Sequence, residues 1–433
     1  MNTNRRFAVR AAALLVVSLA YLGACATTGS KAPDRAFTLA VLPDTQNYMD
    51  YTHQRAEGFP FDAHEQFMGQ MRYIARNVES AGGEIAFVSS LGDVWQHQSL
   101  PIDPEHERRG LRRVPNPILD AHLGFTPKVR EVEMPLARAG FDLIDGKVPF
   151  SVVPGNHDYD AMWTDARFPP ARQFDPRDPG SLGVLHPGGL SNFRAVFGED
   201  QPYFSGKRWY VDAHDGGADS AQVFAAAGYR FLHIGLQFDP PDASLAWAAA
   251  VMQRYPGLPT IVSTHDYMNK EGERLANPMV DGHRVDPLHN TPQMVWDKLL
   301  SRHDQIFLVL CGHQHGQAMR VDTNVAGHRV YQVLADYQDR ARTAIDAGIE
   351  AGYGIGIGDG WMRLLRFDFS GATPTLAVAT YSPHYASFSS DLPTYAAWYK
   401  PGEHPRLEDA AFLALDDFRV ELGDFRERFG DPR

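Results

Sequence analysis

The apolar run Ile306-Phe307-Leu308-Val309-Leu310-Cys311 continues directly into Gly312-His313-Gln314-His315. Six consecutive apolar residues that stop at a glycine are typical of a short strand covered on both faces. Side chains two positions apart in extended chain point to the same side, so His313 and His315 would face the same place. We therefore expect a buried strand whose carboxyl end delivers two imidazoles to one site.

Further apolar runs predict buried strands at 37–41, 85–91, 148–153, 231–236 and 260–263. Apolar residues at helical spacing lie between some of these runs, over 67–78, 136–144, 245–255 and 294–300. The alternation of short apolar strands with helices predicts an α/β fold built in layers. Alternating runs at 329–334 and 361–369 predict a second sheet after residue 316.

Polar residues follow four of these strands, as they follow 306–311. They are Asp44 and Gln46, Gly92-Asp93, Gly155-Asn156-His157-Asp158, and His265-Asp266. In open α/β sheets, ligands bind at the carboxyl ends of the strands. A Gly-Asp pair alone is commonly a turn, and a single histidine is commonly a hydrogen-bonded core or surface residue. The ordered set, with each member at a strand end, indicates a metal site instead.

This ordered set resembles the calcineurin-like metallophosphoesterase superfamily, whose pattern is Asp-x-His, Gly-Asp, Gly-Asn-His-Asp/Glu, His and Gly-His-x-His. The resemblance covers roughly residues 37–370 and is closest to secreted bacterial phosphoesterases whose first motif is Asp-x-Gln. The chain lacks the longer Asp-Arg-Gly signature of protein Ser/Thr phosphatases, and Gln96 stands where purple acid phosphatases carry a metal-binding Tyr. The resemblance implies an α/β fold of four layers, an α-β-β-α sandwich of the metallophosphoesterase type.

The resemblance also implies a centre with two divalent metal ions and assigns its ligands. The first ion would be held by Asp44, Gln46, Asp93 and His315. The second would be held by Asp93, Asn156, His265 and His313, with Asp93 bridging. His157 would face the substrate as a proton donor, oriented by Asp158. The implied enzyme is a phosphoric ester hydrolase that cleaves phosphomono- or phosphodiesters with a two-metal-activated water, acting on a small-molecule or lipid phosphoester.

The ligand types limit the choice of metal and leave one alternative function open. Mixed imidazole and carboxylate ligands suit Mn, Fe or Zn better than Ca or Mg. Gln46 stands where the superfamily usually has a histidine, and its neutral amide oxygen is a poorer donor. This departure leaves room for a non-catalytic envelope lipoprotein that binds phosphorylated ligands through the metal cleft.

Residues beside the ligand motifs and two long insertions are candidates for shaping a cleft. Tyr48, His97 and Tyr159 lie just past ligand motifs, where they would either touch substrate or pack. Insertions at about 95–135 and 160–228 would form lids or walls, or would only decorate the surface. We place the metallophosphoesterase domain at 37–385 and a C-terminal extension at 386–433.

The first residues have the pattern of an export signal. Basic residues precede a short apolar run at 11–22, and Leu22-Gly23-Ala24-Cys25 resembles the lipobox of bacterial lipoproteins. We expect a signal peptide at 1–25, lipidation of Cys25, a polar tether at 26–36 and anchoring to a membrane of the bacterial cell envelope. Cleavage at Ala24-Cys25-Ala26 would instead give a soluble periplasmic or secreted protein. Cys311 would then be left alone, as a small buried apolar residue.

Composition excludes one class of partner. The formal net charge is −12, with 44% hydrophobic and 22% charged residues. These proportions are typical of a globular protein. Because non-specific nucleic-acid binding needs a basic surface, we expect no nucleic-acid partner.

Overall fold

The computed structural model describes residues 35–175, 178–350 and 355–432. The predicted signal peptide with Cys25, and the tether as far as residue 34, lie outside the described residues. None of the helices in the described ranges combines the length and the apolar content that a bilayer span requires. The described chain is mixed α/β, as predicted, and most of its strands form two seven-stranded sheets.

The first sheet has the strand order β15-β14-β13-β1-β2-β3, with β16 paired to β14. Its strands are β1 (Ala36–Leu42), β2 (Ile85–Ser90), β3 (Phe150–Val152), β13 (Met362–Asp368), β14 (Thr375–Ser382), β15 (Ser387–Phe388) and β16 (Phe418–Glu421). Strands β1, β2 and β3 are parallel, whereas β13 runs antiparallel to β1. The carboxyl ends of β1, β2 and β3 therefore lie at one edge of the sheet.

The second sheet has the order β11-β12-β10-β9-β8-β7-β6. Its strands are β6 (Tyr210–His214), β7 (Asp219–Ala226), β8 (Tyr229–Gly235), β9 (Thr260–Ser263), β10 (Ile306–Cys311), β11 (Gly316–Thr323) and β12 (Arg329–Asp336). Its central strands β8, β9, β10 and β12 are parallel. The run 306–311 is fully buried in β10, as its uninterrupted apolar sequence predicts.

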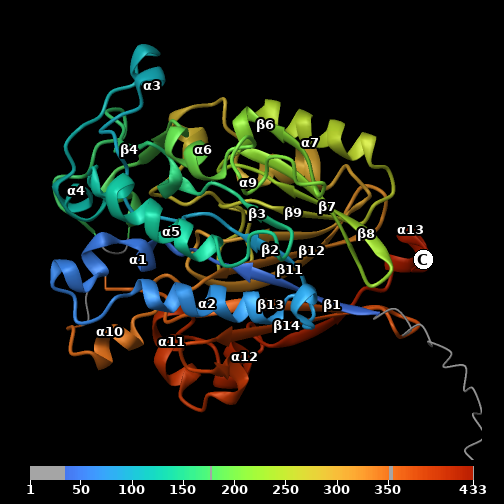
Figure 1. Ribbon diagram of the computed structural model, residues 1–433. Coiled ribbons are helices and arrows are strands. Elements are labelled where there is room, and N and C mark those ends of the chain that lie inside the picture. The colour runs from blue at the N-terminus through green and yellow to red at the C-terminus, as the bar shows by residue number, and fades with distance from the viewer. Residues whose placement is uncertain (1–34, 176–177, 351–354, 433) are drawn as a thin grey trace, which may run out of the picture. The chain divides into compact units, whose positions relative to one another are not determined.

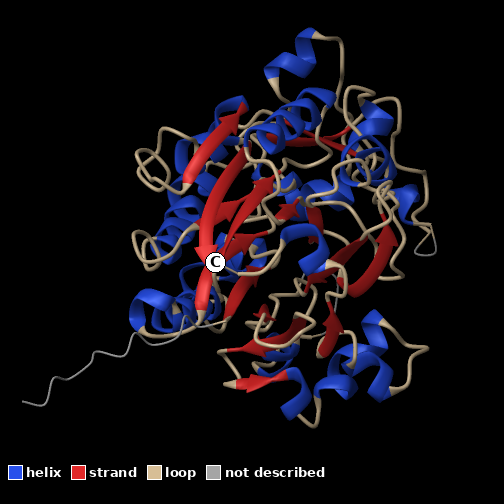
Figure 2. Ribbon diagram, turned by 90° about the vertical axis from the view of Figure 1, so that its right-hand side faces the viewer, coloured by secondary structure: helices blue, strands red, loops and turns tan. Residues whose placement is uncertain are grey.

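Aromatic side chains join the two sheets. Phe37 of β1 lies 5.0 Å from Phe231 of β8 and 4.9 Å from Phe367 of β13, measured between ring centroids. These rings belong to one apolar core with members from both sheets. A second core lies between the first sheet and helices α2 (His64–Asn77) and α5 (Met134–Phe141), and a third between the second sheet and α7 (Asp242–Arg254). Figure 1 shows α2 and α5 along one sheet and α7 along the other, and Figure 2 shows most helices outside the strands.

The remaining elements are short. Strands β4 (Ala161–Thr164) and β5 (Leu185–Gly188) form a small separate sheet. The other α-helices are α1 (Gln46–Met49), α3 (Pro104–Arg108), α4 (Pro117–Leu123), α6 (Ser191–Phe197), α8 (Gly282–Val285), α9 (Pro292–Val295), α10 (Arg342–Asp346), α11 (Tyr395–Glu403), α12 (Asp409–Leu413) and α13 (Phe425–Phe429). The helix predicted at 294–300 is α9 continued by one π-helical turn, Trp296–Leu300.

Strand pairing differs from the prediction in two places. The late runs do not build a sheet of their own, because β12 joins β10 in the second sheet and β13 joins β1 in the first. The stretch 160–228 is an insertion only in part, since β6 and β7 extend the second sheet. Apolar alternation identifies a strand but not its partner, so pairing across long separations was not predictable from it.

The C-terminal residues 386–433 are an integral part of this fold rather than an appended extension. Strand β16 pairs with β14, and Phe412 of α12 packs beside Trp361 and Tyr395. Arg363 of β13 is completely buried and donates to Asp416, which is also completely buried. The side chain of Tyr337 donates to the same carboxylate at 2.8 Å. A buried guanidinium therefore depends on a carboxylate from the last fifty residues for its charge partner.

We expect Asp416→Ala to lower the free energy of unfolding by about 3–5 kcal/mol, because it leaves the Arg363 charge buried without a partner. Urea denaturation followed by circular dichroism measures the change. Asp417→Ala is the matched control, since the neighbouring Asp417 is exposed. Equal stabilities of the two variants would contradict an integral role for this segment.

Candidate metal centre

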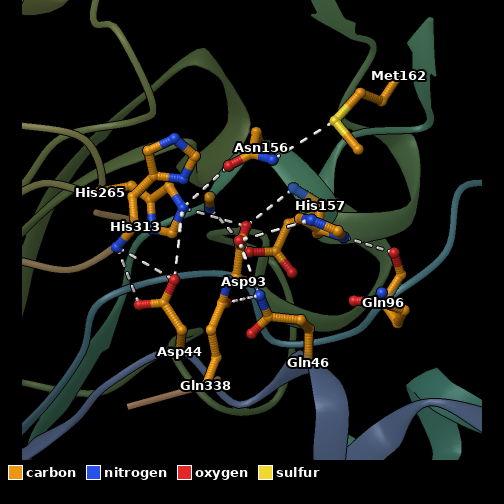
Figure 3. Close-up of polar contacts among 12 residues, drawn as sticks. Asp44, Gln46, Asp93, Gln96, Asn156, His157, Met162, His265, His313 and Gln338 are labelled. Atoms are coloured by element: carbon orange, nitrogen blue, oxygen red, sulfur yellow. Dashed lines mark hydrogen bonds and ion pairs between the residues drawn. The ribbon is translucent and has the colours of Figure 1, made fainter. Parts of the chain in front are cut away.

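The carboxyl ends of strands from both sheets meet at one place. Asp44 follows β1, Asp93 follows β2 and Asn156 follows β3, while His265 follows β9 and His313 follows β10. All five side chains are buried. Figure 3 shows them pointing toward one another around the Asp93 carboxylate. The structure thus brings together residues from five strand ends that are distant in sequence.

Asp93, His265 and His313 form a compact set of donor atoms. One donor atom from each lies within 4.8 Å of the other two, so the set could hold a metal ion. Nε2 of His265 lies 3.2 Å from Oδ1 of Asp93 and 3.1 Å from Oδ1 of Asn156. The Asn156 amide nitrogen donates to the Met162 sulfur at 3.4 Å, which turns the amide oxygen toward His265 (Figure 3). Two nitrogens and two oxygens therefore converge.

Hydrogen bonds leave free lone pairs facing this point. Nδ1 of His265 donates to the Leu91 carbonyl at 2.7 Å, so Nε2 is the lone-pair nitrogen of the neutral ring. Nε2 of His313 is buried and has no hydrogen-bond partner among the described residues. Oε1 of Gln46 is also buried and unpartnered there, although the amide nitrogen of Gln46 is the atom that faces Asp93. Since unpartnered buried polar atoms are costly, these atoms fit a site built to bind a cation.

The residues that would hold the first ion are not all in direct contact with one another, unlike those around His265. The Asp44 carboxylate accepts from the His313 backbone at 3.1 Å, and Nε2 of Gln46 donates to Oδ2 of Asp93 at 3.2 Å. Gln338 links His315 to this group, because its amide bonds both Gln46 and Nε2 of His315. Oε1 of Gln46 would reach an ion beside Asp93 after rotation of its amide.

Sequence reasoning missed three residues at the end of β12 and directly after it. Asp336 accepts from the His315 backbone, Asp339 accepts from Nδ1 of His315, and Gln338 lies between Gln46 and His315. A signal was present, because Asp336-Tyr337-Gln338 repeats the Asp-x-Gln pattern of the first motif at the end of another predicted strand.

The motifs have glycine at positions where neighbouring loops approach too closely to leave room for a Cβ atom. A Cβ on Gly92 would lie 2.5 Å from the backbone nitrogen of Gly155, and one on Gly155 would overlap Asp93. A Cβ on Gly312 would overlap the Asp44 carboxylate. Asp93 has a φ of 49° and His313 a φ of 67°, and residues other than glycine rarely adopt such positive values. Such strain is typical of functional sites.

Charges at the centre are poorly compensated by the protein alone. Burial and the nearby Asp336 hold the pKa of Asp44 well above its usual value. Burial would also raise the pKa of Asp93, but His265 and His157 outweigh it and lower that pKa. Burial acts to lower the pKa of His265, yet Asp93 and Asp44 raise it well above the usual range. The carboxylates of Asp93 and Asp44 therefore favour a positive charge at this point.

His157 lies at the rim of this set, but Asp158 does not orient it as predicted. Nδ1 of His157 donates to the Gln96 carbonyl at 2.6 Å, and Nε2 lies 4.0 Å from Oδ2 of Asp93. The Asp158 carboxylate accepts from the backbones of Val94 and Gly155, each at 2.8 Å. Asp158 therefore joins two ligand loops, and a backbone carbonyl fixes the His157 ring.

A cavity of about 400 Å³ opens onto these residues. Its floor includes Asp93, Asn156, His157, His313 and His315. Its walls are largely apolar and come from both predicted insertions and from later loops: Leu119, Leu123, Met162, Leu185, Met279, Val280, Ile345 and Ile355. The stretches 95–135 and 160–228 thus contribute walls to the cavity.

Of the two roles left open for the residues beside the ligand motifs, substrate contact or packing, the structure shows packing. Tyr48, His97 and Tyr159 are buried and absent from the described lining of the cavity. The Tyr48 hydroxyl accepts from Gly360, and Nδ1 of His97 donates to Glu133 at 2.7 Å. Asn47 and Gln96, one position away from two of them, line the cavity.

Comparisons with known proteins leave the family open. The sequence matches none of the known protein families against which it was scanned. Over 244 residues it is 23% identical to "Uncharacterized protein YvnB" of Bacillus subtilis (strain 168). The aligned part is 55% of this chain and 14% of that relative, so the chain spans only a small part of the relative's length.

We expect Gly155→Ala to weaken metal binding about 10–100-fold, since the new Cβ would displace the Asp93 carboxylate. Titration of the metal-free protein with Mn²⁺ measures the affinity. Gly402→Ala is the control, because a Cβ at Gly402 meets no atom within 4 Å. An unchanged affinity in Gly155→Ala would contradict the assignment of Asp93 as a ligand.

Proposed function

We propose that the protein is a metal-dependent phosphoesterase of the calcineurin-like metallophosphoesterase type. The observation that carries the proposal is the convergence on Asp93 of His265, His313, Asn156 and Gln46, with His157 beside them. Two sheets that face each other across an aromatic core, with helices packed on their outer faces, agree with a four-layer α-β-β-α sandwich.

The donor set supports a centre of two divalent ions, which we assign to Mn, Fe or Zn. Asp93, Asn156, His265 and His313 would hold one ion. Asp44, Gln46, Asp93 and His315 would hold the other, with Asp93 shared. When bound, two such ions supply a hydroxide nucleophile at neutral pH and charge stabilisation for a phosphoryl group.

The chain's own contribution to the reaction is a proton donor and a shaped cavity. Because Nδ1 of His157 is engaged by the Gln96 carbonyl, Nε2 is the atom that would carry a mobile proton into the cavity. That proton would pass to the leaving oxygen of the ester, so that an alcohol rather than an alkoxide departs. The backbone N–H of His157 donates to the Asp93 carboxylate at 2.9 Å and orients it before substrate arrives.

The cavity lining favours a phosphoester with an apolar organic group. Its described lining contains no lysine or arginine, so apart from histidines such as His157 the phosphate charge would meet no cationic side chain there. Leu119, Leu123 and Met279 line the same cavity as the polar residues of the metal centre. We infer that the ions take the phosphoryl end and that the wall takes the organic end of the substrate.

We expect Asp93→Asn and His313→Ala to abolish hydrolysis of a chromogenic phosphoester in the presence of Mn²⁺. His157→Ala should lower kcat by about 10²–10⁴-fold while its metal content stays normal, because its backbone N–H still donates to Asp93. His303→Ala, remote from the centre, is the control. Full activity of a metal-verified Asp93→Asn protein would refute the proposal. Tight phosphoester binding without turnover across several metals would favour the non-catalytic binding protein instead.

We expect Gln46→His to tighten the first ion's binding, because imidazole is a better donor than a neutral amide. In the native protein that ion should bind more weakly than the second and prefer harder ions such as Mn²⁺. Stepwise affinities from calorimetric titration compare the two proteins. Identical first-site affinities would contradict the role given to Gln46.

A further inference from the structure

A second group of histidines lies outside the candidate metal centre. His106 on α3, His186 on β5, and Asp286 and His289 after α8 bring one donor atom each within 4.8 Å of the others. We refer to these four residues as the His3Asp cluster. None of them belongs to the Asp93 set or to the described lining of the cavity.

Two of the imidazoles are already oriented as metal ligands usually are. Nδ1 of His106 donates to the Asp103 carboxylate at 2.6 Å, and Nδ1 of His289 donates to the Asp239 carbonyl at 2.8 Å. Each bond leaves Nε2 as the lone-pair nitrogen, and Nε2 of His106 is buried without a hydrogen-bond partner among the described residues. Ligand imidazoles typically donate their other N–H to a carboxylate or a backbone carbonyl in this way.

His186 has no hydrogen-bond partner among the described residues. Its side chain is 0% exposed, and neither ring nitrogen makes a hydrogen bond to a described residue. The ring lies 4.9 Å from His106 and 5.6 Å from His289, measured between centroids. A fully buried imidazole with two unsatisfied nitrogens costs about 1–3 kcal/mol for each lost partner. A bound ion would satisfy one nitrogen.

Asp286 supplies the negative charge of the cluster. Its side chain is buried, and its Oδ2 lies 3.7 Å from Nε2 of His106. Arg109 donates to the same oxygen, and the Leu288 backbone donates to Oδ1 at 3.2 Å. A carboxylate has about four lone-pair positions, so Asp286 retains room for an ion beside these donors.

We propose that the His3Asp cluster is a structural zinc site. Three imidazoles and one carboxylate form a closed four-ligand set, which is typical of Zn²⁺ and unlike the oxygen-rich sites of Mg²⁺ and Ca²⁺. Zinc–ligand distances of about 2.0–2.1 Å place tetrahedral ligands about 3.3 Å apart. The four side chains would therefore close in by roughly an ångström or more, a change within reach of rotamer adjustment.

An ion here would brace the wall of the cavity. The cluster joins α3, β5 and the loop after α8, which are separate segments of the chain. Leu185, next to His186, lines the cavity and donates its backbone N–H to Met279, another wall residue, at 2.7 Å. The site would thus stabilise the surface opposite the metal centre without touching the reacting atoms.

Zinc retention in full-length variants tests the proposal. The double variant Asp93→Asn/His313→Ala disables the candidate metal centre around Asp93. In this variant we expect one equivalent of Zn²⁺ to remain after dialysis against a mild chelator. Added Zn²⁺ should also raise the Tm of this double variant. Adding His186→Leu should remove both the bound equivalent and the rise in Tm. Leucine fills the buried space. If the cluster serves only for packing, the variant with His186→Leu should therefore be at least as stable as its parent.

Two further variants keep the outcome decisive. His289→Ala acts at the more accessible edge of the cluster and should also release the ion, even if His186→Leu folds poorly. His303→Ala, in neither group, should retain it. Zinc content unchanged by His289→Ala, or absent from the parent double variant, overturns the proposal. Because the parent lacks the Asp93 centre, this result is independent of phosphoesterase activity.

Discussion

The Asp93 carboxylate is the point on which the candidate centre depends. Its backbone is held at φ of 49°, and its oxygens contact the backbone N–H of His157, Nε2 of His265 and the amide of Gln46. The loops around it approach so closely that Gly92 and Gly155 leave no room for a Cβ. Each loop therefore restricts the positions of its neighbours, and the donor atoms of Asp93, His265 and His313 form one compact set.

The contributing strands come from two different sheets, so the aromatic core between the sheets matters as much as the loops. Phe37 and Phe231 set the distance between β1 and β8, and thereby between Asp44 and the loops of the second sheet. A cavity in this core would change the spacing of ligands that it never touches. The spacing of the polar ligands at the strand ends therefore depends on the apolar packing between the two sheets.

Much of this could be predicted because it is local in sequence. A strand such as β10 and the His313 that follows it occupy one short stretch, so the apolar run predicts where its polar residues emerge. The ordered motifs therefore identified the buried donors around Asp93. Hydrogen-bond partners were less predictable: Asp158 bonds Val94 and Gly155 rather than the adjacent His157, because folding brings other donors closer.

Long-range pairing was the main limit on prediction. Nothing in the run 361–369 indicates that β13 pairs with β1, and nothing near His186 indicates three partners from elsewhere in the chain. The ring of His289 packs against that of His186 although more than a hundred residues separate them in the sequence. Gln338 follows a predicted strand, but the sequence does not indicate that β12 pairs with β10 and so places Gln338 beside His315.

The position of β1 has a consequence for how the chain folds. This first described strand lies inside its sheet, between β2 and β13, and Phe37 is directly opposite Phe367. During synthesis, the β2 side of β1 can pair early, but its other side stays open until nearly the whole chain has been made. Such distant pairing is slow and leaves a hydrophobic strand edge unpaired. The nascent chain therefore depends on protection from aggregation until its last quarter arrives.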